Sequence, residues 1–195
     1  MKKLVLLGFI IMVAGILISC STPKIEDYQG REPELVLENF FAGDLLAYGI
    51  VRDRSGKVIR YFKAVLKGSW DNGVGTLDEV FWFNDGKRET RIWTMQPAEN
   101  GGYIGTAPDV KGQAHIRSSG NAVHLVYSLI VPYKDSTITL SMDDWMYQVA
   151  PGIVINETAM SKWGFNVGKV TLVIARADAA EHFQPLIQQF DVVPE

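Results

Sequence analysis

This chain of 195 residues contains two adjacent carboxylates, Asp143 and Asp144, which could act as an acid or a base. They lie in a stretch that alternates apolar and polar residues, which predicts a strand whose neighbouring side chains point to opposite faces. The two carboxylates therefore cannot act as one acid–base pair. Asp144 follows the apolar face and is predicted to point inward, where a buried carboxylate needs a partner. Arg60 and Arg176 also lie on apolar faces and are the candidate partners.

A second possible inward pair is Glu79 with Arg91, because each follows the apolar face of its own predicted strand. A cross-strand pair of opposite charges contributes roughly 0.2–1 kcal/mol. Together with Trp93 and Trp145, these residues are the candidate ligand site or internal polar site. For the buried carboxylates a structural ion pair, a ligand-orienting site and a catalytic acid stay open, and no residue is assigned as catalytic.

The sequence predicts neither a metal site nor a cofactor. Its histidines, His115, His124 and His182, lack the spacing of metal ligands, and the single cysteine, Cys20, excludes Cys-rich zinc sites. Aromatic side chains either line a pocket for an apolar ligand or form an ordinary β-core. These aromatic residues are Trp70, Phe81, Trp82, Phe83, Trp93, Trp145, Tyr147 and Trp163.

The elements that must position these residues are predicted to be strands. Apolar and aromatic runs between Leu45 and Arg176 are separated by Gly, Asn, Asp and Pro, which gives about nine or ten strands joined by hairpin turns. Period-two alternation within the runs indicates one buried and one wet face, as in an antiparallel meander. Because closure removes exposed edges, we expect an all-β, up-and-down β-barrel, with a two-sheet sandwich as the alternative.

Both termini are predicted to be helical. Phe183, Leu186, Ile187 and Phe190 have the spacing of one apolar helix face, so a short C-terminal helix is expected. At the other end, a basic start at residues 1–3 precedes the apolar run 4–18, which is typical of a signal-peptide helix.

The apolar run ends in Leu17-Ile18-Ser19-Cys20, which resembles a lipobox, the recognition sequence of bacterial lipoproteins. The resemblance implies cleavage between Ser19 and Cys20, and acyl chains on Cys20 that anchor the protein to a membrane. An uncleaved anchor helix or a buried core helix is the alternative. The predicted organisation is a signal peptide at 1–19, a lipidated N-terminus and tether at 20–33, and one barrel domain at 34–195.

Charge and the residue after the cysteine bear on the location. The formal net charge is −3, and the loss of two lysines with the signal peptide makes it −5. A mildly acidic domain does not suit nucleic acid or adhesion to anionic lipid, so the acyl chains must supply the anchoring. In lipoproteins of Gram-negative bacteria, an Asp directly after the lipidated cysteine favours the inner membrane. This chain has Ser21 there, so we expect the protein to be anchored in the outer membrane and to face the periplasm.

Several segments resemble the bacterial lipoprotein family catalogued as domain of unknown function 3833. They are Leu77–Phe81 with Asp85–Gly86, Arg91–Trp93, Tyr103–Val110, Gly120–Ala122, Asp143–Tyr147 and Met160–Gly164. The resemblance implies no activity and no catalytic residues. The architecture is also similar to lipocalin-type barrels, although the chain lacks a Gly-x-Trp in the first strand and a Thr-Asp-Tyr turn.

The sequence thus predicts a non-enzymatic envelope lipoprotein that binds a small apolar molecule, such as a lipid or fatty acid, in a β-barrel. One alternative is an interaction or scaffold module with a packed barrel and protein partners that the sequence does not identify. The other is an enzyme acting on a lipid-like substrate, with Asp144 and Glu79 as acid or base. An open or a filled barrel interior separates these hypotheses.

Overall fold

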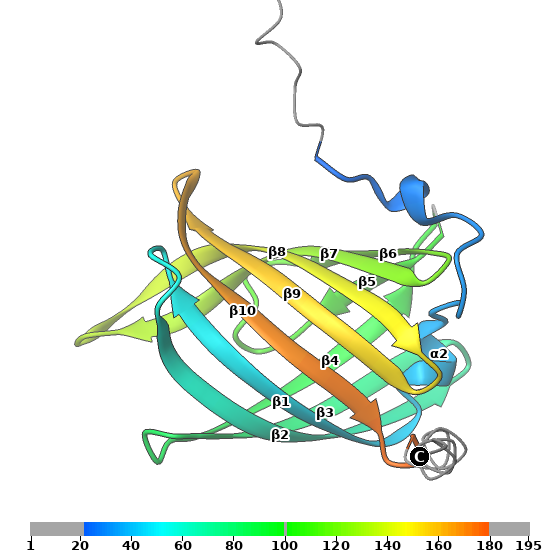
Figure 1. Cartoon of the computed structure of the whole chain (residues 1–195), viewed down its shortest axis with the longest axis horizontal. Helices are drawn as coiled ribbons and strands as arrows, with labels where there is room; N and C mark the ends of the chain where they lie inside the picture. The colour runs from blue at the N-terminus through cyan, green and yellow to red at the C-terminus, as the bar shows by residue number, and fades with distance from the viewer. Residues whose placement is uncertain (1–21, 100, 180–195) are drawn as a thin grey trace, which may run out of the picture.

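A computed structural model describes residues 22–99 and 101–179, and within them the chain forms a ten-stranded closed β-barrel (Figure 1). The strands are β1 (Gly43–Asp53), β2 (Val58–Asp71), β3 (Val74–Phe83), β4 (Arg88–Pro97), β5 (Tyr103–Thr106), β6 (Ala114–Ser119), β7 (Ala122–Tyr133), β8 (Ser136–Ala150), β9 (Ile153–Lys162) and β10 (Phe165–Arg176). Within the described residues, two short helices precede the strands, the 3-10 helix η2 (Ile25–Tyr28) and α2 (Leu37–Phe40).

Every strand pairs antiparallel with its neighbours in the sequence, and β1 pairs with β10 to close the barrel. The prediction of an antiparallel up-and-down barrel is confirmed, and the sandwich is wrong. Closure satisfies the backbone groups that an open edge would leave unpaired. The predicted signal-peptide helix and C-terminal helix lie outside the described residues.

Alternation along the strands builds the core. In β2, for example, Phe62, Ala64 and Leu66 are buried inside the barrel, whereas Tyr61 and Lys63 are exposed outside. The same pattern brings Glu79 and Asp144 to the inside, as predicted, and both are buried.

One end of the barrel is closed by the segment 35–41, which includes α2 (Figure 1). Leu35, Phe40 and Phe41 are buried and belong to the main hydrophobic cluster. The segment lies so close to β2 that a Cβ atom on Gly68 would fall 1.5 Å from the carbonyl oxygen of Phe41. Glycine at position 68 is therefore required for this closure.

The N-terminal segment lies on the outside of the barrel. Ile25 is buried against Ala122 and Trp145, and the ring of Tyr28 lies 5.7 Å from that of Trp145. Part of the segment expected to be a tether thus packs on the barrel, although its first residues lie outside the described ones. Across 22–99 and 101–179 no helix is long and apolar enough to cross a bilayer.

Candidate functional site

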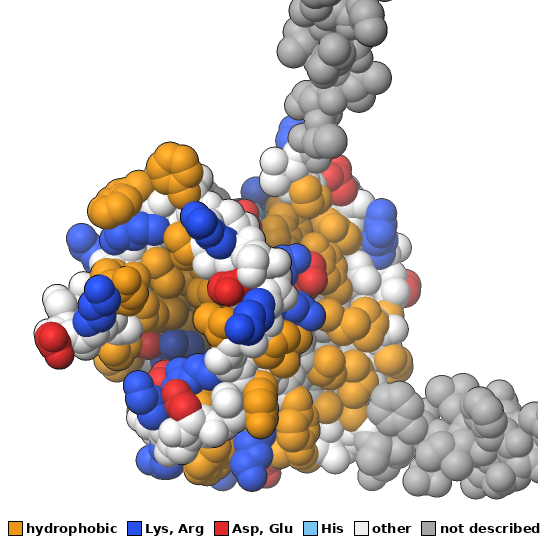
Figure 2. Space-filling model, turned by 60° about the vertical axis from the view of Figure 1, so that its left-hand side comes forward, with side chains coloured by type: hydrophobic (Ala, Val, Ile, Leu, Met, Phe, Trp, Pro, Cys, Tyr) orange, Lys and Arg blue, Asp and Glu red, His pale blue; other side chains and the backbone are white. Residues whose placement is uncertain are grey.

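The end of the barrel opposite α2 is open. Figure 2 shows a hollow there, bordered by hydrophobic side chains, with basic and acidic side chains inside it. Inward side chains near this end are only partly buried, unlike those deeper in the barrel. We call this hollow the cup, and its apolar wall consists of Val51, Phe81, Phe83, Val131, Ile138, Met160, Val170 and Leu172.

At the rim of the cup, Arg60 is bound by acidic residues of the β3–β4 hairpin. Its Nε lies 3.0 Å from Asp85 Oδ2 and its Nη1 lies 3.1 Å from Glu89 Oε1. Its guanidinium carbon also lies 3.3 Å from the ring centroid of Phe83. The predicted pairing of Arg60 with Asp144 is therefore wrong, because closer carboxylates satisfy the arginine.

Deeper in the barrel, Glu79 lies directly opposite Arg91 on adjacent strands, as predicted. Arg91 Nη1 is 3.6 Å from Glu79 Oε2, while Nε and Nη2 hold Asp109 at 3.0 and 2.8 Å. Glu79 is 8% exposed, and burial raises the pKa of its carboxyl group to about 7, although the charge of Arg91 opposes the shift. Its Oε2 atom is buried and accepts no hydrogen bond.

Asp144 is 6% exposed and points inward from β8. Asn156 Nδ2 donates a hydrogen bond to its Oδ1, and the Tyr127 hydroxyl donates a long one, of 3.5 Å, to its Oδ2. Burial raises the pKa of Asp144 to about 6, and these hydrogen bonds lower it in part. The expected arginine partners are thus replaced by uncharged side chains of β7 and β9.

Tyr127 is buried and interacts electrostatically with both carboxylates, Asp144 and Glu79. Its ring packs edge-on against Trp93 at 5.4 Å, and burial raises the pKa of its hydroxyl group well above the usual value, with Asp144 adding to the shift. We call this set of polar residues inside the barrel the floor cluster: Glu79, Arg91, Asp109, Tyr127, Asp144, Asn156 and Thr158. It can exchange hydrogen bonds with a polar group that reaches the bottom of the cup, and two of its carboxyl groups change charge near neutral pH.

The other predicted site residues lie elsewhere. Arg176 is at the closed end, where its Nη1 donates to the carbonyl oxygens of Asn39, Phe40 and Ala42 at 2.6–3.1 Å. Trp145 is on the outer face beneath Ile25, so its assignment to the internal site is wrong. Trp93 is inside and buried, as predicted. Cys20 and Ser19 lie outside the described residues.

Of the aromatic residues proposed for a pocket, half point inward. Trp70, Phe81, Phe83 and Trp93 belong to the core cluster, whereas Trp82, Trp145, Tyr147 and Trp163 lie on the outside or at a turn. Sequence reasoning missed Asp109, Tyr127, Asn156 and Thr158. Alternation with the buried Val154 places Asn156 and Thr158 inside, so that signal was present in β9. Asp109 lies in the loop between β5 and β6, where strand alternation cannot predict the direction of a side chain.

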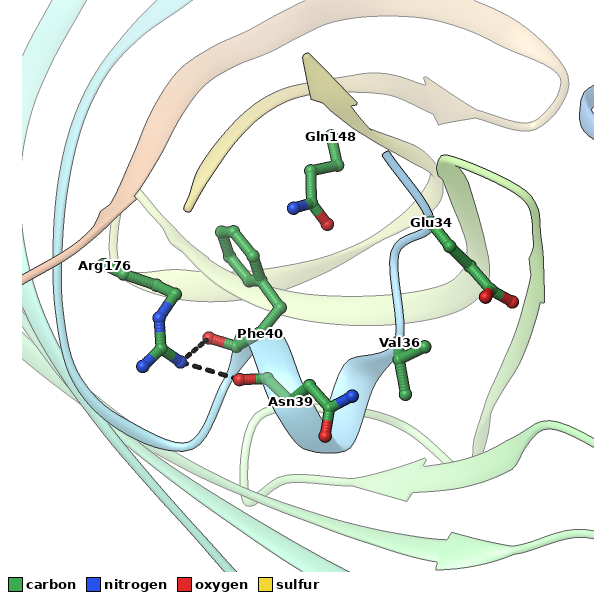
Figure 3. A pocket seen from close by; sticks show the side chains of 6 residues that line it. All are labelled: Glu34, Val36, Asn39, Phe40, Gln148 and Arg176. Carbon is green, nitrogen blue, oxygen red and sulfur yellow. Dashed lines mark hydrogen bonds between the residues drawn. The ribbon is translucent and has the colours of Figure 1, made fainter. Parts of the chain in front are cut away.

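A small pocket at the closed end has a volume of about 160 Å³. Figure 3 shows its lining residues, with Arg176 hydrogen-bonded to the backbone of the closing segment; they are Glu34, Val36, Asn39, Phe40, Gln148 and Arg176. The Arg176 guanidinium is bound to backbone carbonyls and to Asp178, so this arginine holds the closing segment in place. Among residues 22–99 and 101–179, no three His, Cys, Asp or Glu side chains could together hold a metal ion.

Residues 14–176 match the family described as a protein of unknown function, DUF3833. The chain belongs to this family. Among curated proteins none matches it. Among solved structures, the fold is similar to that of the S-type phycobiliprotein lyase CPES from Guillardia theta, with a TM-score of 0.50 and 10% identity. The match covers 79% of this chain and 98% of the lyase, and it confirms the lipocalin-like barrel architecture that the DUF3833 sequence predicts.

Proposed function

We propose that this DUF3833 protein is a lipid-anchored envelope lipoprotein whose barrel binds a small, mainly apolar molecule in the cup. The observation that carries the proposal is the cup itself: its inward apolar side chains stay partly exposed, above a buried floor in which Glu79 Oε2 accepts no hydrogen bond. Apolar concave sites with a few convergent polar groups are typical of ligand pockets. The similarity to a lyase barrel adds support at the level of fold alone.

The floor cluster favours a ligand with an uncharged polar end. Arg91 is held by Asp109 and Glu79, and Arg60 is held by Asp85 and Glu89, so neither arginine is free for an anionic head group. Glu79, with its pKa of about 7, can accept a hydrogen bond when ionised and donate one when neutral. A long-chain alcohol, amide or monoacylglycerol fits this chemistry better than a fatty acid carboxylate.

Filling the cup tests the proposal. Met160→Trp adds an indole to the inner wall, whereas Ile92→Trp adds the same group to the outer face of β4. With the uncharged fluorescent probe N-phenyl-1-naphthylamine, we expect the inner variant to weaken binding roughly tenfold, about 1.4 kcal/mol, and the outer variant to leave binding unchanged.

Native mass spectrometry of the wild-type protein identifies the natural ligand, and solvent extraction should release the same molecule. Equal probe affinity in both tryptophan variants, or no bound molecule and no probe binding, would contradict a ligand in the cup. A packed barrel that acts as an interaction module would then be the better description.

A further inference from the structure

The turn between β9 and β10 contains a residue that its backbone does not favour. Trp163 and Gly164 form a two-residue hairpin loop with φ angles of 52° and 82°. Loops with two positive φ values prefer Asn-Gly, and a bulky residue in the left-handed region is strained. Asn72 and Gly73, in the turn between β2 and β3, show the preferred solution with φ angles of 50° and 79°. Tryptophan at position 163 is therefore not required by the fold.

The side chains at this turn are also unusually exposed. Trp163 is 86% exposed and Phe165 is 74% exposed, the highest values among the large hydrophobic residues of the described chain. The ammonium group of Lys162 lies 5.1 Å from the Trp163 ring centroid and donates a hydrogen bond of 2.8 Å to the carbonyl oxygen of Thr139. An amphipathic aromatic ring beside a lysine is the pattern that membrane–water interfaces favour.

The place of the turn in the molecule agrees with a membrane contact. In Figure 1 the β9–β10 turn and the start of the described chain both reach the upper side of the barrel. Thr22 is two residues from Cys20, a span of at most about 7 Å in an extended chain. A bilayer that holds acyl chains on Cys20 would thus lie on the side to which the turn points.

We propose that Trp163 and Phe165 insert into the interface of a lipid bilayer and form a second membrane contact beside the acyl chains. This inference rests on the proposed anchoring at Cys20. Because the β9–β10 turn borders the open end of the barrel, the contact holds the mouth of the cup next to the lipid head groups. A lipid-like ligand would then enter and leave the cup along the membrane surface.

Quenching by brominated lipid tests the contact. The lipidated full-length product is purified in detergent and reconstituted into phosphatidylcholine vesicles, with or without bromine on the upper acyl chains. Trp163→Asn removes the indole and introduces the residue type that the β2–β3 turn has at Asn72, where the backbone φ is similar. Trp82→Phe is the matched control, because Trp82 is a half-exposed tryptophan on the outer face of β3.

We expect bromine to reduce wild-type tryptophan emission, Trp163→Asn to lose most of that reduction, and Trp82→Phe to retain it. Trp163→Asn should unfold at the wild-type temperature or above it, which separates the contact from folding. Equal quenching in wild type and Trp163→Asn overturns the inference, as does a wild-type protein that floats with vesicles without quenching. Failure to float overturns the Cys20 anchor as well. Self-association that Trp163→Asn abolishes would instead assign the turn to a second copy of the chain.

Discussion

At the scale of single residues, Glu79 combines two properties that rarely occur together. It is buried beside Arg91, yet its Oε2 atom lacks a hydrogen bond, which is costly in a dry interior. Burial keeps the pKa of the carboxyl group near 7 instead of 4.5, so the group changes charge within the physiological range. A ligand that donates to Oε2 would remove this cost.

The raised pKa of Glu79 predicts a pH-dependent stability. Between about pH 4.5 and pH 7 the folded protein holds a proton that the unfolded chain has lost, so the free energy of unfolding falls as pH rises, by roughly 3–4 kcal/mol at most. Asp144, whose pKa is raised to about 6, acts in the same direction. Glu79→Gln should flatten much of this dependence in urea unfolding curves at a series of pH values.

Glu157→Gln is the matched control for this measurement, because Glu157 is a half-exposed partner of Lys169 outside the floor cluster. We expect it to retain the wild-type pH dependence. A wild-type protein whose stability rises through this range, or a Glu79→Gln profile equal to that of wild type, would show that Glu79 is ionised without cost.

At the scale of the elements, the local sequence predicted which face of a strand a side chain lies on, but not how deep in the barrel it lies. Period-two alternation correctly placed Glu79 and Asp144 inside, because each side of a strand is fixed by its neighbours. It did not predict that Arg60 lies at the rim while Asp144 lies deep, since the relative height of distant strands depends on the stagger of the closed barrel. The pairing of Arg60 with Asp144 failed for this reason.

Trp145 shows a second limit of local patterns. Its neighbour Asp144 points inward, so alternation already placed Trp145 outside, but its aromatic ring suggested a pocket. In the structure the Trp145 ring packs against Ile25 and Tyr28, which belong to a segment without apolar periodicity. A contact between segments so far apart in the chain leaves no local signal.

A substitution in η2 tests whether the packing of the N-terminal segment on the barrel contributes to stability. Ile25→Asp places a charge against Trp145 and should detach the segment, with a loss of about 1.5–3 kcal/mol of stability, the value of burying the isoleucine. Urea unfolding and a red shift of the Trp145 emission measure it. Gln29→Asp adds the same charge at an exposed position and should change neither; a similar loss in both variants would point to net charge as the cause.

At the scale of the whole molecule, the two ends of the barrel differ. The closed end is occupied by Leu35, Phe40 and Phe41, which Arg176 holds in place, whereas at the other end apolar side chains stay partly exposed above the buried floor cluster. This asymmetry was not predicted from sequence, because the closing segment contributes only one turn of helix and no strand. It makes one end a candidate entrance and the other a structural base.

The proposed anchor is also tested on the whole molecule. Cys20→Ser removes the attachment point of the acyl chains, each buried methylene of which contributes about 0.8 kcal/mol, so the protein should move from the membrane fraction to the soluble fraction. Ser21→Ala keeps the cysteine and should remain with the membrane. Cell fractionation followed by immunoblotting compares them, and a Cys20→Ser protein that stays in the membrane fraction after washing would refute lipidation as the anchor.

The pairing of β1 with β10 also determines when the protein can finish folding. Leu45 must find Arg176, close to the last described residue, before the sheet has no free edge. A topology with such distant contacts folds slowly, and unpaired edges promote aggregation until it is complete. During synthesis, which starts at the N-terminus, the barrel cannot close until β10 has emerged. Chaperones that cover unpaired strand edges would therefore matter most before β10 pairs with β1.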